Sequence, residues 1–133
     1  MNLDQALEEY GKALVVNPNN FEVYLQRGDI YVAKSSFEQA LQEYSKAIEL
    51  NPNSSNTYNR RGAIYMTVGN LVRAIQDFDK VLSFNPNDAQ TYYARGITYA
   101  TAGGYNNALQ DFKKACDLGH SEACSSFNGL MQQ

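Results

Sequence analysis

The residues best suited to chemistry stand near the C-terminus, where a histidine lies between two cysteines. His120 is the single histidine of the chain, and Cys116 and Cys124 are its two cysteines. A cysteine beside a histidine can form a thiolate–imidazole pair for nucleophilic catalysis. The same three side chains could serve as metal ligands, but a structural metal site takes four, so the set is incomplete. We therefore expect a histidine in a surface turn, with no metal and no catalytic residue.

Other parts of the sequence give no stronger indication of catalysis. Gly103-Gly104 lacks the strand–loop–helix context of a phosphate-binding loop, and no GxGxxG or P-loop pattern is present. The carboxylate pairs Asp77/Asp79 and Glu8/Glu9 are expected on solvated helix surfaces. We predict a chain that is not an enzyme and that holds no cofactor.

Composition excludes further classes of protein. With 133 residues, 44% hydrophobic and 19% charged, the chain suits one folded domain better than a disordered segment. A net charge of −3 leaves no basic excess for phosphate contacts, which argues against a nucleic-acid partner. No apolar run approaches 18 residues, so insertion into a membrane is not expected.

The elements that position these residues follow a 34-residue period. All three prolines follow an asparagine and stand at positions 18, 52 and 86. The copies 21–54, 55–88 and 89–122 share seven identities, which in the first copy are Tyr24, Arg27, Gly28, Tyr31, Ala40, Gln42 and Lys46. A fixed period of this length predicts stacked structural units.

Each copy predicts two helices. Tyr24, Gly28 and Tyr31 share one face of the first helix, and an apolar stripe from Phe37 to Ile48 follows in the second. The recurring glycine and Ala40 indicate a close crossing of the two helices. The turns between helices are expected at Ser35-Ser36, Gly69-Asn70 and Gly103-Gly104.

This spacing of Tyr, Gly, Tyr, Ala and Pro resembles the tetratricopeptide repeat, with tyrosine in place of the family's usual first tryptophan. The resemblance implies an all-α fold, a right-handed α–α superhelix built as a solenoid of antiparallel helix pairs. It also implies a protein-interaction role, with the first helices lining a concave face that binds peptide segments.

The two ends depart from the full repeat. Residues 1–20 match its second half, so the chain begins within a unit. We expect the apolar side of helix 3–16 to be less covered than in an internal repeat, either as a frayed end or packed on a second copy of the protein. Within 121–133, a helix over Ala123–Met131 is predicted to cap the stack, with Ser121 as a candidate N-cap.

The segment 114–124 also resembles the Sel1-like repeats, whose two cysteines bridge adjacent antiparallel helices. That resemblance implies a disulfide between Cys116 and Cys124, whereas the residues alone favour two buried thiols. A disulfide requires an oxidising compartment. The lack of a signal peptide favours the cytoplasm, but a chain that begins within a repeat can have lost one, so a periplasmic or secreted location stays open.

Charged residues recur with the same period. An arginine precedes the packing glycine and an acidic residue precedes the second-helix aromatic in every copy, giving Arg27, Arg61 and Arg95 against Glu43, Asp77 and Asp111, with Glu9 in the half-repeat. We predict an ion pair between the two helices of each copy. The alternative is a row of cations for an anionic ligand.

The candidate binding surface is the side of the first helices that the core stripe does not use. Its members combine amides, acids and apolar side chains: Glu22, Leu25, Asp29, Asn56, Asn59, Met66, Gln90, Tyr93 and Ile97. Amides can bind a peptide backbone, and Tyr93 can anchor a side chain. The alternative is that crowded helices show apolar character on every side.

One known subtype of the resembling family clamps a C-terminal carboxylate with cations at this face. The matching positions are Leu25, Asp29, Arg60, Gln90 and Ala94, of which only Arg60 is cationic. We predict no such clamp. The expected ligand is a mostly uncharged or mildly basic segment whose basic end meets Glu22 and Asp29.

The leading function is a non-enzymatic scaffold for a protein or peptide partner. The alternative is a self-assembly unit that forms a homo-oligomer through the half-repeat.

Overall fold

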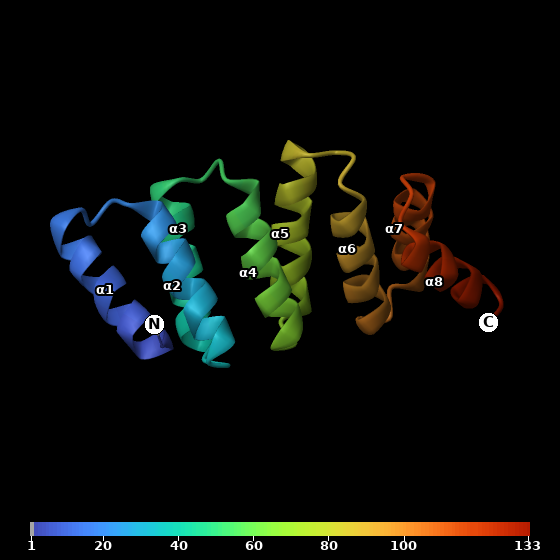
Figure 1. Cartoon of the computed structure of the whole chain (residues 1–133). Helices are drawn as coiled ribbons and strands as arrows, with labels where there is room; N and C mark the ends of the chain where they lie inside the picture. Colours follow the sequence, from blue (N-terminus) through green and yellow to red (C-terminus); the bar gives the residue numbers. More distant parts are fainter. Residues whose placement is uncertain (1) are drawn as a thin grey trace.

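The structure, a computed structural model, describes residues 2–133. Over this range the chain forms eight helices and no strand: α1 (Leu3–Val16), α2 (Phe21–Ala33), α3 (Phe37–Leu50), α4 (Ser55–Thr67), α5 (Leu71–Phe84), α6 (Ala89–Thr101), α7 (Tyr105–Asp117) and α8 (Ser121–Met131). Figure 1 shows them stacked in a row, with α1 at one end and α8 at the other. The predicted all-α solenoid, seven repeat helices and a cap, is confirmed.

The helices pack as three pairs, α2 with α3, α4 with α5 and α6 with α7, and each pair packs on the next through α3–α4 and α5–α6. Inside each pair the glycine of the first helix lies against the aromatic ring of the second. A Cβ atom on Gly62 would stand 2.9 Å from Phe78, and one on Gly96 2.7 Å from Phe112. The close crossing predicted from the recurring glycine is therefore confirmed.

The turns follow from backbone chemistry. Gly69 and Gly103 have a φ of +85° between the helices of their pairs, and Ser35 occupies the same place with a φ of +58°. A positive φ costs glycine nothing, whereas Ser35 bears a steric penalty there. Between pairs, the hydroxyl of the recurring tyrosine donates to the proline carbonyl, at 2.9 Å for Tyr58 and Pro52. This bond closes the loop that leads into each first helix.

The C-terminal cap differs from the prediction in two details. α8 begins at Ser121, two residues before the expected start, and its N-cap is His120. The N-cap residue lies outside the helix in an extended conformation, and His120 meets that condition with φ −83° and ψ 103°. The His120 Nδ1 atom accepts the Ala123 backbone N–H at 3.1 Å. Ser121 lies inside the helix and cannot take this place.

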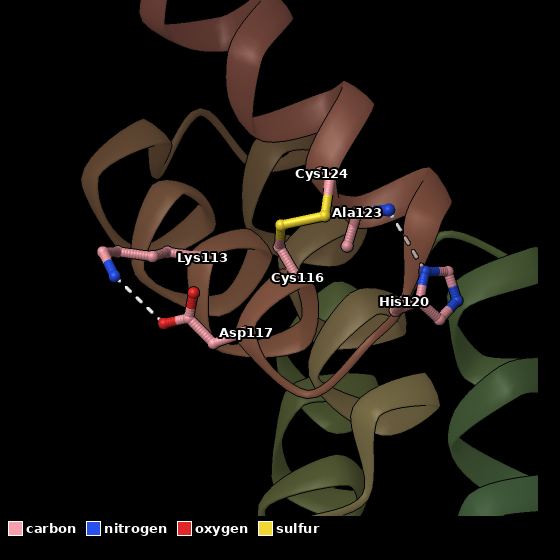
Figure 2. Close-up of a disulfide and its surroundings, with 6 residues drawn as sticks. All are labelled: Lys113, Cys116, Asp117, His120, Ala123 and Cys124. Carbon is pink, nitrogen blue, oxygen red and sulfur yellow. Dashed lines mark hydrogen bonds and ion pairs between the residues drawn. A yellow bond between two sulfur atoms is a disulfide. The ribbon is translucent and has the colours of Figure 1, made fainter.

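A disulfide ties this cap to the stack. Figure 2 shows the sulfur–sulfur bond from Cys116 of α7 to Cys124 of α8, with His120 at the turn between them. The two Cα atoms are 4.7 Å apart, a distance that a disulfide spans. The structure thus joins the two sulfur atoms and does not leave two buried thiols.

Candidate binding surface

Four of the predicted surface residues meet in one cleft between α2 and α4. Its volume is about 410 Å³. The predicted members are Glu22, Leu25, Asp29 and Asn56, and they are joined by Phe21, Gln26, Ser54 and Arg60. The cleft therefore combines two apolar side chains with amide, hydroxyl and charged groups, a mixture that suits a peptide with both backbone and side-chain contacts.

Two charged side chains of this cleft, Asp29 and Arg60, are already paired with each other. Asp29 accepts the Tyr44 hydroxyl at 2.6 Å through Oδ1 and pairs with Arg60 through Oδ2. Arg60 also donates from Nε to the Asn56 amide oxygen at 3.2 Å. Burial, together with the hydrogen bond to Asp29, raises the pKa of Tyr44. Asp29 therefore already has two partners within the chain, and Glu22 is the exposed carboxylate of the cleft.

The apolar residues of the surface belong partly to the core. Leu25 packs against a cluster that includes Ile64 of the next pair, and Met66 packs against Phe78 and its neighbours. The expectation that the surface residues lie outside the core stripe is wrong for these two. The reason is that a first helix packs both on its own partner and on the following pair, which a single-helix pattern does not reveal.

Two predicted residues are engaged by the cap. The ring of His120 stacks on Tyr93, with centroids 4.3 Å apart, and its Nε2 lies 2.9 Å from the Gln90 side-chain oxygen. The N-cap residue of α8 thus contacts two side chains of α6. Asn59 and Ile97 are half-buried on α4 and α6. The nine predicted residues therefore do not form one continuous open site.

The recurring arginines form the predicted ion pairs. Arg61 donates from Nε and Nη2 to both oxygens of Asp77, at 2.9 and 2.8 Å, and Arg95 does the same to Asp111 at 2.8 and 2.7 Å. Arg27 makes one bond of 3.1 Å to Glu43. Hydrogen bonding to Asp77 raises the pKa of Arg61, and burial raises that of Glu43, which Arg27 partly offsets. The three arginines therefore form ion pairs inside the stack and are not a row of free cations.

Sequence reasoning missed a second cleft, of about 520 Å³. Its lining residues come from α3 and, in one case, from α4: Glu38, Leu41, Gln42, Ser45, Lys46, Glu49 and Tyr65. Its α3 members are spaced three or four apart, so they share one face of the helix. That spacing is visible in the sequence, but by itself it predicts an ordinary solvent-exposed helix face.

Within residues 2–133, no group of three histidine, cysteine or acidic side chains is placed to hold a metal ion. Over the same range, no helix combines the length and the apolar character needed to cross a membrane.

Comparison with known families agrees with this architecture. A model described as TPR repeat matches residues 2–35 and 28–69. Models described as tetratricopeptide repeat match residues 55–88 and 78–110. No curated protein sequence matches the chain significantly.

Solved structures of MamA proteins share the fold. MamA residues 41 to the end from Desulfovibrio magneticus RS-1 align with a TM-score of 0.85 at 21% identity, over 98% of this chain and 84% of that one. MamA AMB-1 aligns with a TM-score of 0.77 at 30% identity, over 86% of this chain and 68% of that one. Together with the matched repeats, these likenesses show that the chain belongs to the tetratricopeptide repeat family.

Proposed function

We propose that this protein is a non-enzymatic scaffold that binds an extended segment of a partner protein across α2, α4 and α6. Membership of the repeat family supports a role in protein interaction. The observation that carries the finer proposal is the α2–α4 cleft, where four of the surface residues chosen from the sequence lie together.

The cleft can bind a peptide through groups that are already held in place. Gln26 and Asn56 are exposed and offer amide donors and acceptors to a backbone. Tyr44 and Arg60 hold Asp29 from two sides, so the floor of the cleft does not reorganise when a peptide enters. A preformed site lowers the entropy cost of binding. Glu22 then favours a basic side chain at one end of the peptide.

The same geometry disfavours a terminal carboxylate. The cation of the cleft, Arg60, is neutralised by Asp29, and Glu22 adds a negative charge nearby. An acidic C-terminal chaperone peptide is therefore expected not to bind. Saturable binding of such a peptide in a fluorescence titration would contradict the proposed chemistry.

The test is an affinity pull-down read by mass spectrometry, with a variant of the cleft beside a matched variant of the α3 face. The cleft variant is Glu22→Lys/Asn56→Ala, and the control is Glu38→Lys/Gln42→Ala, which makes the same change of charge and also removes one amide side chain. We expect a partner that the wild type and the control retain and the cleft variant loses. A partner lost only from the control would place binding on the α3 side and overturn the proposal.

A further inference from the structure

The ring of His120 links two helices, each through one of its nitrogens. Nδ1 accepts the backbone N–H of Ala123, in the first turn of α8, at 3.1 Å. Nε2 lies 2.9 Å from the side-chain oxygen of Gln90 on α6, and the ring stacks on Tyr93 of the same helix with centroids 4.3 Å apart. Figure 2 shows the ring at the turn between α7 and α8, with the bond to Ala123 drawn. His120 is therefore a side-chain link between α6 and α8.

This link requires one protonation state of the ring. Ala123 donates, so Nδ1 must keep its lone pair, whereas the Gln90 oxygen accepts, so Nε2 must carry the proton. That is the neutral imidazole. The imidazolium has a proton on both nitrogens, and its Nδ1–H would face the Ala123 N–H with no acceptor between them. The positive end of the α8 dipole also disfavours a cation at this position.

The contacts with α6 do not preserve the link when the ring is charged. A cation over an aromatic face is favourable, and a charged ring can still donate from Nε2 to Gln90. The charged ring can therefore stay on Tyr93, but it cannot cap α8 at the same time. Protonation thus breaks the link at its α8 end.

The charged groups around the turn are engaged elsewhere or exposed. Asp117 of α7 points away from His120 toward Lys113, with which it pairs at 3.0 Å (Figure 2). Asp88 serves as the N-cap of α6. Glu122 lies in the first turn of α8 and is exposed. Its carboxylate favours the protonated ring, and Glu122→Gln removes that influence.

We propose that His120 makes the attachment of α8 sensitive to pH. Histidine ordinarily changes charge between about pH 5 and 8. Above this range the ring is neutral and the link is intact, and the link is lost as the pH falls and the ring takes up its second proton. α8 is then held by its packing on α7 and by the disulfide. With the disulfide intact, the first turn of α8 frays; after reduction, the whole of α8 can detach.

The link also concerns the candidate binding surface, because Gln90 and Tyr93 belong to it. A pH-dependent change at these two residues would regulate binding of a partner at α6. That consequence rests on the proposed function, whereas the link itself is tested on the protein alone, without any partner. Failure of one is therefore distinguishable from failure of the other.

The first test is an NMR titration of the oxidised wild type. The amide proton of Ala123 should change its chemical shift with the same midpoint as the ring protons of His120, because the bond between them is lost on protonation. In Glu122→Gln the two signals should still move together. An Ala123 amide that does not follow the titrating ring would overturn the proposal.

The second test measures the attachment of α8 by chymotrypsin cleavage after Phe127, in the Cys116→Ala/Cys124→Ala chain. That chain is compared with versions that also carry His120→Asn, which caps α8 at every pH, or His120→Ala, which caps it at none. At about pH 8 the histidine chain should be cleaved at least as slowly as the asparagine chain. At about pH 5.5 it should be cleaved about fivefold faster than the asparagine chain, close to the alanine chain. Comparison at one pH cancels the pH dependence of the protease.

A further variant, Gln90→Ala, tests the α6 end of the link. It should speed cleavage of the histidine chain at about pH 8 and leave the alanine chain unchanged, because that chain has no ring for Gln90 to bind. A ratio of histidine to asparagine cleavage that is the same at both pH values would overturn the proposal. So would equal cleavage of the asparagine and alanine chains, because the N-cap would then have no influence on α8.

Discussion

At the scale of single residues, the ion pairs show how one methylene changes a repeated contact. Aspartate at positions 77 and 111 lets both carboxylate oxygens face the guanidinium. Glu43 is longer and makes a single bond, which leaves the Arg27 Nε and the Glu43 Oε2 buried without a partner. A buried polar atom without a partner costs stability. The first pair is therefore the weakest of three contacts that share the same register.

The arginines also reach back to the preceding pair, and in this contact too the copies differ. Arg95 donates from Nη1 to Asp79 at 2.8 Å, and Arg61 donates to Ser45 at 3.1 Å. The equivalent position before Arg27 is Gly11, which has no side chain to accept a bond. The link between successive pairs thus strengthens along the chain.

These differences predict a graded loss of stability on removal of each arginine. Arg61→Ala leaves Asp77, whose side chain is 5% exposed, without its cation. We expect a cost of about 3 kcal/mol, or a fall of roughly 10 °C in Tm. Arg27→Ala, which loses one bond, should cost about 1 kcal/mol.

Circular dichroism melts of both variants check this order, with Lys113→Ala as the control because its pair with Asp117 is exposed on both sides. An unchanged Tm for Arg61→Ala would show that the pair contributes nothing to the fold.

The sequence allowed prediction of those residues that recur in all copies, because their contacts recur too. The arginine–carboxylate pairs and the glycine–aromatic contacts are of this kind. Three fully buried threonines, Thr57, Thr91 and Thr98, were not foreseen, since a threonine does not mark a core position. The bond between Tyr44 and Asp29 was missed for a related reason: no other copy has both groups at these positions.

At the scale of the elements, α8 is the piece that the repeat pattern determines least. Its position depends on contacts that occur once in the chain: the disulfide to α7 and the contacts of His120 with Tyr93 and Gln90. The sequence predicted a capping helix from its apolar residues. It did not predict the N-cap, because serine is a commoner N-cap than histidine and the stacking partner of His120 lies on another helix.

Reduction of the disulfide is expected to loosen α8 alone. In the chain-entropy account, closing a loop of about nine residues raises the free energy of the unfolded segment by roughly 2.5 kcal/mol. α8 packs on α7, so the three helix pairs lose no internal contact when it detaches.

Limited chymotrypsin digestion measures this detachment through cleavage after Phe127, which is half-buried in α8. Cleavage should be faster in reductant and in Cys116→Ala/Cys124→Ala, and similar in the two. Equal rates with and without reductant in the wild type would show that the packing of α8 does not need the bond.

At the scale of the whole molecule, contacts between neighbours add up to a stack with unequal ends. In a solenoid each unit contacts its neighbours, so stability is a sum of local terms that can vary along the chain. α1 has α2 as its packing neighbour, and Gly11 offers Arg27 no acceptor. The C-terminal end carries the ion pair of Arg95 with Asp111, which has two hydrogen bonds, and it also carries the disulfide. The periodic sequence predicted the stack, but this polarity arises where the copies differ.

Hydrogen exchange is therefore expected to start at the N-terminal end. Amides of α1 should exchange fastest among the repeat helices, followed by those of α2, and those of α5 and α7 should exchange last. Gly11→Asp should slow exchange in α1 and α2, because the new carboxylate gives Arg27 the acceptor that Arg95 finds in Asp79. A Cβ at Gly11 meets no atom within 4 Å, so the substitution causes no clash. Mass spectrometry of the exchanging peptides gives the order directly. Uniform exchange over all the repeat helices would mean that the chain opens as one cooperative unit, and that the differences between its copies do not set where it opens.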